Sequence, residues 1–317
     1  MSIPPDPFVS GDLRAERRLV YARQCAVAAD WQAASDILEQ TVDLVPHWAP
    51  GWFELAQARE KTSDFEGAAA AFRRVLALDP QDLLGAGPRL AVLEGAQTRG
   101  LPAAYVRRLF DDYAPRFDAH LVGDLGYRAP DVLIGLIEDA YPNRRFPRTL
   151  DLGCGTGLAA AVLAARSDDL TGVDLSAAMI EKARGRGLYS QLTAVEARVH
   201  LDLLPPADLD LIFAADVVVY FGALEELFTS AQRALRPQGL LAFTCERTST
   251  DEFRLNATMR FAHSAAYIRS VAAASGFCER VFVEVAVRAE KGAPALGFAV
   301  VLQKADEGAV ARNIAGR

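Results

Sequence analysis

The chain has 317 residues, enough for two ordinary domains that each bury a core. It carries 34 basic and 41 acidic residues, a net charge of −7, so it lacks the basic surface that binding to nucleic acid requires. Four widely separated cysteines favour a reducing compartment. Because no stretch approaches the ~20 apolar residues of a membrane span, we expect a cytoplasmic protein with no membrane partner.

The first 97 residues contain an internal repeat of 34 residues. The matching pairs are Ala22 and Ala56, Trp31 and Phe65, Ala34 and Ala68, Leu38 and Phe72, and Pro46 and Pro80. This is the tetratricopeptide period, in which each unit is a helix pair with small residues where the helices cross. We therefore predict an all-α tetratricopeptide-repeat (TPR) domain over residues 1–97.

Two units are fewer than the three or so that normally close such a stack. The helical run Asp82 to Gln97, the rest of the chain or a second copy could cover the open face. The oligomeric state therefore stays open. The repeat domain could equally bind a substrate, a partner protein or another copy of itself.

A second domain is expected over residues 98–304. It begins with helical segments over 98–142, interpreted as a lid, and continues with alternating strands and helices. The expected strands are 148–152, 169–174, 190–196, 208–214 and 238–246, and the expected helices are 157–166, 176–186, 223–235 and 264–275. Such alternation predicts a parallel sheet, and the short connection between strands 278–288 and 296–303 predicts an antiparallel end. Residues 248–262 are expected to form an irregular loop and 305–317 a flexible tail.

A glycine-rich loop follows the first expected strand. Its residues are Asp151, Gly153, Cys154, Gly155, Thr156 and Gly157. Glycine lets the backbone turn sharply and approach a ligand closely, and the next helix offers free N–H groups. The second strand ends in Asp174, where a carboxylate can accept both hydroxyls of a ribose. The loop and the acid predict a nucleotide-cofactor site that suits either NAD or S-adenosylmethionine.

Two features favour the methyl donor. The closing β-hairpin differs from a purely parallel dehydrogenase sheet, and no Tyr-x-x-x-Lys pair of the short-chain dehydrogenases exists in the chain. With the motif Asp-x-Gly-x-Gly-x-Gly at 151–157, residues 148–304 resemble a class I S-adenosylmethionine-dependent methyltransferase with a Rossmann-like fold. More narrowly, residues 10–304 are similar to bacterial methyltransferases with tetratricopeptide repeats, through the segments 113–121 and 260–264.

The resemblance implies a set of cofactor contacts. The three loop glycines would frame the methionine and ribose, Asp174 would hold the ribose hydroxyls, and Asp151 would orient the loop and the amino group. Glu196 would receive the adenine amino group, although relatives usually have Asp there. The expected set is completed by Tyr113, Cys154, Thr156, Leu175, Met179 and Asp216.

Methyl transfer from a sulfonium depends chiefly on alignment. Near-attack positioning contributes ~7–11 kcal/mol, against ~3–5 kcal/mol for a general base. Where a proton must leave, His263 is the first candidate for the base and His120 the second. His263 could instead fix the start of the next helix.

Further candidates lie on the acceptor side. Tyr113 and Tyr220 could contact the sulfonium through their ring faces, or could be packing residues. Tyr220 is also a candidate for catalysis and for substrate binding. Arg260 could bind a substrate carboxylate or phosphate, or could pair with Asp251 or Glu252 on the surface.

The leading hypothesis is methyl transfer to a small molecule by in-line displacement. A protein or peptide methyltransferase that docks its substrate in the repeat groove is the second hypothesis. A non-catalytic cofactor-binding scaffold and an NAD enzyme are further alternatives. The sequence does not specify whether oxygen, nitrogen, sulfur or carbon is methylated.

Overall fold

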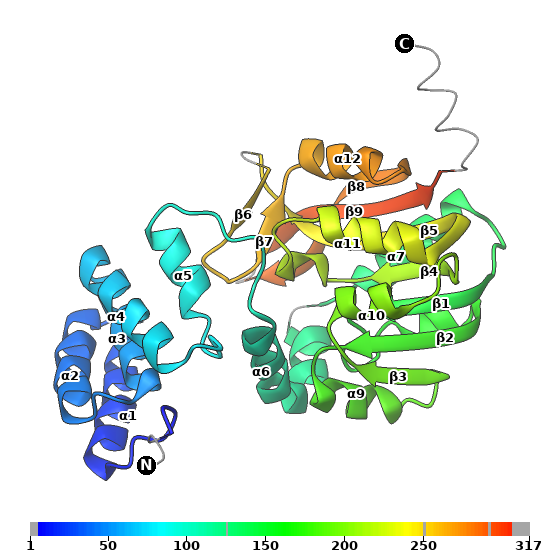
Figure 1. Cartoon of the computed structure of the whole chain (residues 1–317). Coiled ribbons are helices and arrows are strands. Elements are labelled where there is room, and N and C mark those ends of the chain that lie inside the picture. Colours follow the sequence, from blue (N-terminus) through cyan, green and yellow to red (C-terminus); the bar gives the residue numbers. More distant parts are fainter. Residues whose placement is uncertain (1–5, 125, 250–251, 291–292, 306–317) are drawn as a thin grey trace. The chain divides into compact units, whose positions relative to one another are not determined.

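The chain divides into two compact units, Met1–Tyr105 and Val106–Arg317 (Figure 1). The computed structural model describes residues 6–124, 126–249, 252–290 and 293–305. The division between the units falls within helix α6 (Ala103–Tyr113). The junction expected near residue 98 stays a prediction. Among the described residues, no helix has the length and apolar character needed to cross a membrane.

Unit 1 is a helical region, as predicted. Its helices are α1 (Leu13–Val27), α2 (Trp31–Leu44), α3 (Ala49–Lys61), α4 (Phe65–Leu78) and α5 (Ala86–Leu93). α2 and α4 begin 34 residues apart, and each starts with an aspartate cap: Asp30 accepts from the Ala33 N–H and Asp64 from the Gly67 N–H. Four small residues of the repeat are almost completely buried, namely Ala22, Ala34, Ala56 and Ala68. Small side chains let neighbouring helices approach closely, which explains why the repeat keeps alanine there.

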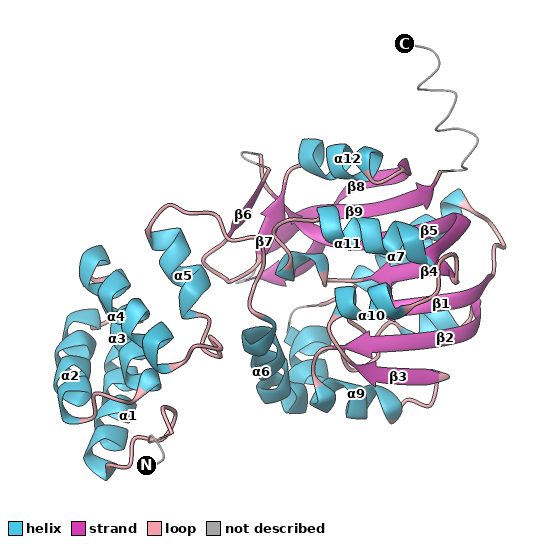
Figure 2. Ribbon diagram, viewed as in Figure 1, coloured by secondary structure: helices cyan, strands magenta, loops and turns pink. Residues whose placement is uncertain are grey.

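Unit 2 is a Rossmann-like α/β fold with a mixed sheet (Figure 2). Its strands are β1 (Phe146–Leu152), β2 (Ser167–Asp174), β3 (Gln191–Ala194), β4 (Leu209–Ala214), β5 (Leu235–Arg247), β6 (Phe253–Leu255), β7 (Phe261–His263), β8 (Phe277–Glu290) and β9 (Ala293–Lys304). The main path has the order β3-β2-β1-β4-β5-β7-β6. β9 pairs antiparallel with β5, and β8 pairs antiparallel with β9. The predicted antiparallel end is therefore confirmed.

Helices cover both faces of this sheet (Figures 1 and 2). They are α7 (Ala129–Ala140), α8 (Ala160–Ala164), α9 (Ala177–Arg184), α10 (Ala197–Leu203), α11 (Glu225–Ala234) and α12 (Ala265–Ala274). Short π- and 3-10 helices add Ala114–Arg116, Ala119–Asp124 and Val218–Tyr220. Leu133 and Ile137 of α7 pack against Leu211 and Phe213 of β4 in one core. α7 is thus part of the folded core, whereas α6 and the segment after it lie nearer the glycine loop.

Two local predictions were wrong. Residues 248–262 are not an irregular loop, because they contain β6 and most of β7, which pair antiparallel. α10 was not predicted, since its seven residues are too few to show a helical period. The proposed tail, 305–317, lies almost entirely outside the described residues.

β5 changes its neighbour at Glu246. Up to that residue β5 runs antiparallel to β9, with Glu246 opposite Gly297. From the same residue it runs parallel to β7, with Glu246 opposite Ala262 and Arg247 opposite His263. The sheet therefore forks at Glu246, and the β6–β7 hairpin is attached at this fork.

Candidate active site

The glycine loop at the end of β1 needs its glycines. Gly153, Gly155 and Gly157 all have left-handed backbones, with φ of 68°, 54° and 82°. A Cβ on Gly153 would lie 2.4 Å from Cγ2 of Val217, closer than any side chain tolerates. Both conformation and space therefore exclude other residues at Gly153.

Asp174, at the end of β2, is hydrogen-bonded to this loop. Its Oδ2 accepts from the Gly155 N–H at 2.9 Å and its Oδ1 from the Ser176 N–H at 2.8 Å. Each carboxylate oxygen can accept a further hydrogen bond. Burial raises the pKa of Asp174, and the two backbone N–H groups oppose this. This geometry leaves both oxygens able to accept from a ligand with two neighbouring hydroxyls, and ribose binding by Asp174 stays a prediction.

Asp151 lies beneath the loop and is almost fully buried, with 2% of its surface exposed. Tyr189, between α9 and β3, donates its hydroxyl to Oδ2 of Asp151 at 2.6 Å. Burial raises the pKa of Asp151 to about 7. Burial also raises the pKa of the neighbouring Cys154 thiol, which therefore stays protonated. Sequence reasoning missed Tyr189, because nothing in its local pattern links it to a residue 38 positions earlier.

The segment after α6 lies over the glycine loop. The Phe117 ring is 3.8 Å from the point where a Cβ on Gly155 would be. Asp118 accepts a hydrogen bond from the Thr156 hydroxyl and pairs with Arg186 at 2.8 Å. Arg186 also donates to the Thr156 carbonyl at 2.5 Å. These contacts bury Thr156 and hold the segment against the loop.

Tyr113 and His120 are brought together in this same segment. The Tyr113 hydroxyl and Nδ1 of His120 share a hydrogen bond. The Tyr113 ring meets the Phe117 ring edge to face, with centroids 5.1 Å apart. Both predicted residues are thus connected to the glycine loop through Phe117.

Arg260 joins the ends of β4 and β5. Its Nη2 pairs with Asp216, its Nε with Glu246 at 2.6 Å, and its Nη1 donates to the Tyr220 hydroxyl at 3.1 Å. The Arg260 side chain is 11% exposed, so the expected surface pairing with Glu252 is wrong. Asp251, the other expected partner, is outside the described residues. Burial lowers the pKa of Arg260, but the adjacent acids outweigh this and raise it overall.

Aromatic rings connect the loop side to Arg260. Phe110 of α6 contacts both the Phe117 ring, at 6.2 Å between centroids, and the Tyr220 ring, at 5.4 Å. Arg260 in turn lies over the Tyr220 ring, 5.6 Å from its centroid. Asp216, just after β4, has a left-handed backbone with φ of 63°. Such strain in a residue other than glycine is typical of functional sites.

His263 is not placed with these residues. It is fully buried, and its Nε2–H donates to the Gly222 carbonyl at 3.0 Å. Its ring stacks on Tyr267 with centroids 6.1 Å apart. Burial lowers its pKa to about 4. Ser264 caps α12 by accepting from the Tyr267 N–H at 3.2 Å. The geometry therefore favours the alternative role for His263, fixing the start of this helix.

Other predicted cofactor contacts have structural partners. Glu196 caps α10, accepting from the Arg198 and Val199 N–H groups at 3.0 Å. Met179 is fully buried, whereas Leu175 beside Asp174 is half-buried. Adenine binding by Glu196 stays a prediction.

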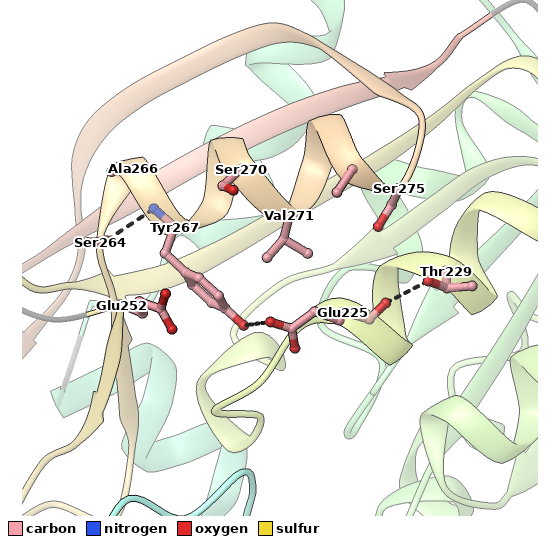
Figure 3. A pocket seen from close by; sticks show the side chains of 10 residues that line it. Glu225, Thr229, Glu252, Ser264, Ala266, Tyr267, Ser270, Val271 and Ser275 are labelled. Carbon is pink, nitrogen blue, oxygen red and sulfur yellow. Dashed lines mark hydrogen bonds between the residues drawn. The ribbon is translucent and has the colours of Figure 1, made fainter. Parts of the chain in front are cut away.

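A separate groove of about 610 Å³ lies between α11 and α12 (Figure 3). Tyr267 donates to Glu225 at 2.9 Å across it, and Thr229 donates to the Glu225 carbonyl at 2.8 Å. Its lining includes no residue of the glycine loop. Within the described part of the chain, no cluster of His, Cys, Asp or Glu could hold a metal ion.

The glycine loop at the end of β1 and the acid at the end of β2 define a nucleotide-cofactor-binding α/β domain. Residues 150–243 match the family model described as a methyltransferase domain. Residues 150–243 therefore form a methyltransferase domain, and a solved structure with the same fold was crystallised with S-adenosylhomocysteine, the product of S-adenosylmethionine.

Several curated proteins are similar to this chain. Malonyl-(acyl-carrier protein) O-methyltransferase of Enterobacter lignolyticus is 32% identical over 139 residues, 44% of this chain and 52% of that protein. Human methyltransferase-like protein 27 is 31% identical over 159 residues, which are 48% of this chain and 62% of that protein. Trans-aconitate 2-methyltransferase of Escherichia coli is 32% identical over 133 residues, which are 41% of this chain and 50% of that protein. The chain thus spans about half the length of most of these relatives.

Solved structures share the fold. A magnesium protoporphyrin IX methyltransferase from Synechocystis, crystallised with S-adenosylhomocysteine, is 14% identical with a TM-score of 0.50, covering 64% of this chain and 99% of that one. The (4+2)-cyclase SpnF is 20% identical with the same TM-score, covering 63% and 95%. Because one neighbour is named a cyclase, the fold alone does not determine the reaction.

Proposed function

We propose that this protein transfers a methyl group from S-adenosylmethionine to a small-molecule acceptor. The observation that carries the proposal is the left-handed glycine loop whose Gly155 N–H is bonded to Asp174. When bound, S-adenosylmethionine supplies an activated methyl group on a positively charged sulfur. The residues present fit this ligand, because Asp174 can accept from ribose hydroxyls and Asp151 offers a carboxylate to an amino group.

The chain's main task is then to position the acceptor and keep water out. The acceptor would enter beside Asp216 and Tyr220, where Phe110 and Phe117 lead from the glycine loop. Its lone pair would form the bond to the methyl carbon as the carbon–sulfur bond breaks. Alignment of this kind is worth ~7–11 kcal/mol. His120 is the better placed imidazole if a proton must leave, since His263 is fully buried.

Relatives support the choice of a small acceptor. Their names include a trans-aconitate 2-methyltransferase and a ubiquinone biosynthesis O-methyltransferase, the latter 28% identical over 119 residues. A protein or peptide substrate docked through unit 1 is the alternative, and the name malonyl-(acyl-carrier protein) O-methyltransferase shows that one relative acts on a group carried by a protein. The atom that receives the methyl group is left open.

Calorimetric titration with S-adenosylhomocysteine tests the cofactor site, with NAD as the control ligand. Asp174→Asn keeps the size of the side chain but replaces one acceptor oxygen with a donor, so affinity should fall at least about thirtyfold, or ~2 kcal/mol. Asp169→Asn, on the same strand but partly exposed and paired with Arg148, is the matched control. Wild-type protein that binds NAD and not S-adenosylhomocysteine would overturn the proposal.

Turnover is tested by release of S-adenosylhomocysteine in an acceptor screen. We expect a small acceptor to be methylated by wild type and not by Asp174→Asn. If only protein substrates are methylated, the peptide-docking alternative replaces the small-molecule proposal. Cofactor binding without turnover of either class would favour the non-catalytic scaffold.

We also propose that unit 1 is a pair of tetratricopeptide repeats. The 34-residue offset between α2 and α4 and the buried alanines at equivalent positions support this. Ala22→Leu and Ala56→Leu should then destabilise the chain by similar amounts, about 1–3 kcal/mol, because each overfills an equivalent helix crossing. Ala28→Leu, at an exposed position, is the control. Unequal effects in a denaturant titration would argue against equivalent repeats.

A further inference from the structure

Tyr189 occupies a space that two glycines leave open. A Cβ on Gly172 of β2 would lie 2.9 Å from Cε1 of Tyr189, and a Cβ on Gly157 would lie 3.1 Å from Cε2. The next residue, Ser190, anchors the backbone by donating its N–H to the Leu170 carbonyl at 2.8 Å. The ring is therefore fixed between β2 and the glycine loop, and its hydroxyl has a defined direction.

That hydroxyl meets one oxygen of Asp151. The distance from Oη to Oδ2 is 2.6 Å, and the carboxyl group is almost fully buried. Within the described part of the chain, the other oxygen, Oδ1, has no hydrogen-bond partner. Oδ1 is also not completely buried, in contrast to the Tyr141 hydroxyl, which is buried without a partner. One oxygen is thus held, and the other keeps some exposure and remains able to accept.

Charge makes this pair sensitive to a cationic ligand. Burial raises the pKa of Asp151 to about 7, and the nearby Asp174 carboxylate raises it further, against the lowering effect of the Tyr189 hydroxyl. Burial and Asp151 raise the pKa of Tyr189, so the phenol stays a donor. The titratable groups around Asp151 are Asp174 at the end of β2, Cys154 in the loop, Tyr127 before α7 and Tyr189. Arg186 is a cation that lowers the pKa of Tyr189, and it is itself paired with Asp118. A bound ammonium group would add positive charge beside Asp151 and favour the ionised carboxylate.

We propose that Tyr189 is a positioning residue that fixes Asp151 so that its second oxygen receives the amino group at the methionine end of the cofactor. The inference rests on the proposed function and adds the group that orients the acid. Tyr189 itself does not touch the cofactor amino group. It acts by holding Oδ2, which fixes the rotation of the carboxylate.

Two ligands separate this role from simple packing. S-adenosylhomocysteine has the amino-acid end, whereas 5′-methylthioadenosine has the same nucleoside and a thioether without it. In calorimetric titrations of the full chain, Tyr189→Phe should weaken S-adenosylhomocysteine about tenfold and leave 5′-methylthioadenosine within about twofold, since one hydrogen bond to a charged group is lost. Tyr141→Phe is the matched control, because the Tyr141 hydroxyl is buried without a partner in the described chain.

The pH profile gives a second readout. Wild-type affinity for S-adenosylhomocysteine should rise between pH 6 and 8 as Asp151 ionises, and that for 5′-methylthioadenosine should stay level. Loss of the Tyr189 donor raises the pKa of Asp151, so the midpoint should move to higher pH in Tyr189→Phe. Tyr141→Phe should keep the wild-type midpoint.

The outcomes distinguish this inference from the proposed function. Equal weakening of both ligands in Tyr189→Phe would show that the hydroxyl supports the loop as a whole and does not orient Asp151 towards the amino group, and unchanged affinity for both would show that the hydroxyl has no role in binding. Either result overturns the inference while wild-type binding of S-adenosylhomocysteine still stands. If wild type binds neither ligand, the proposed function fails together with the inference.

Discussion

The two halves of the candidate site are built in different ways. On the cofactor side, the candidate ligand-binding groups come from the backbone of the glycine loop and from acids at the ends of β1 and β2, within a short stretch of sequence. On the acceptor side, Arg260 joins Asp216, Glu246 and Tyr220, which lie 14 to 44 residues away in the chain. The cofactor side therefore depends on local conformation, and the acceptor side on tertiary packing of charges.

The largest expected effect is on the acceptor side. Arg260→Gln leaves Asp216 and Glu246 buried near each other without the guanidinium between them. Breaking a buried pair in this way costs about 3–5 kcal/mol of the free energy of unfolding. Arg269→Gln breaks an exposed pair with Glu279 and should cost less than about 1 kcal/mol. Equal costs in urea titrations would contradict the importance we give to burial.

Two buried groups, Asp151 beneath the glycine loop and His263 in β7, should make stability depend on pH in opposite directions. The pKa of Asp151 is raised from 3.8 in the unfolded chain to about 7 in the folded protein. The unfolded state therefore releases its proton first, and stability is lost as pH rises from about 4 to 7. The pKa of His263 is lowered from 6.5 to about 4, so the unfolded state takes up the proton first and stability is lost as pH falls from about 6.5 to 4. At most, the effect is about 4–5 kcal/mol for Asp151 and about 3–4 kcal/mol for His263.

Difference curves isolate these contributions. The free energy of unfolding of wild type minus that of Asp151→Asn should fall with rising pH, and wild type minus His263→Gln should fall with decreasing pH. Urea titrations at several pH values measure both. Two flat difference curves would show that neither group keeps its perturbed pKa.

The third effect concerns the conformation of the loop. Gly153→Ala requires a left-handed alanine and a contact 2.4 Å from Val217, so it should cost about 2–3 kcal/mol and abolish measurable binding of S-adenosylhomocysteine. Gly135→Ala in α7, where nothing lies within 4 Å of the new methyl group, should be neutral or slightly stabilising. Normal cofactor affinity in Gly153→Ala would refute the close approach of this backbone.

The smallest effect concerns Glu196. As the cap of α10 it accepts two backbone N–H groups, and Glu196→Ala should cost about 1 kcal/mol of stability. Glu181→Ala, in an exposed pair with Arg184, should change stability by less than about 0.5 kcal/mol. If affinity for S-adenosylhomocysteine also falls in Glu196→Ala alone, the predicted adenine contact gains support. Unchanged stability in Glu196→Ala would be inconsistent with the cap.

The left-handed conformation of the glycine loop could be predicted from the sequence for a physical reason. Glycines at alternate positions after an apolar strand report a backbone requirement, which is local and visible in one stretch of sequence. The strands other than β6 and β7 were also found, because apolar runs bounded by turns are local signals. The capping role of Glu196 was not predicted, because a single acid before a short helix can either cap that helix or bind a ligand. Adenine binding by Glu196 stays a prediction.

The acceptor side could not be predicted in the same way. Arg260 was singled out, but its partners depend on how β4, β5 and β7 come together. Tyr189 was missed because its contact with Asp151 crosses from one βα unit to the next. His263 was judged by residue type alone, and only the fold reveals that Phe253 and Tyr267 enclose it.

The fork at Glu246 separates the stability of the sheet from the shape of the acceptor side. The β6–β7 hairpin is attached through two register positions only, whereas β9 keeps seven positions against β5. A protein engineer could therefore change the exposed residues of the hairpin and leave the β5–β9 ladder in register, provided that Arg260, which lies between β6 and β7, keeps its pairs with Asp216 and Glu246. The hairpin is the natural cassette for changing substrate preference, because the strands that carry the glycine loop lie on the other side of β4 and β5.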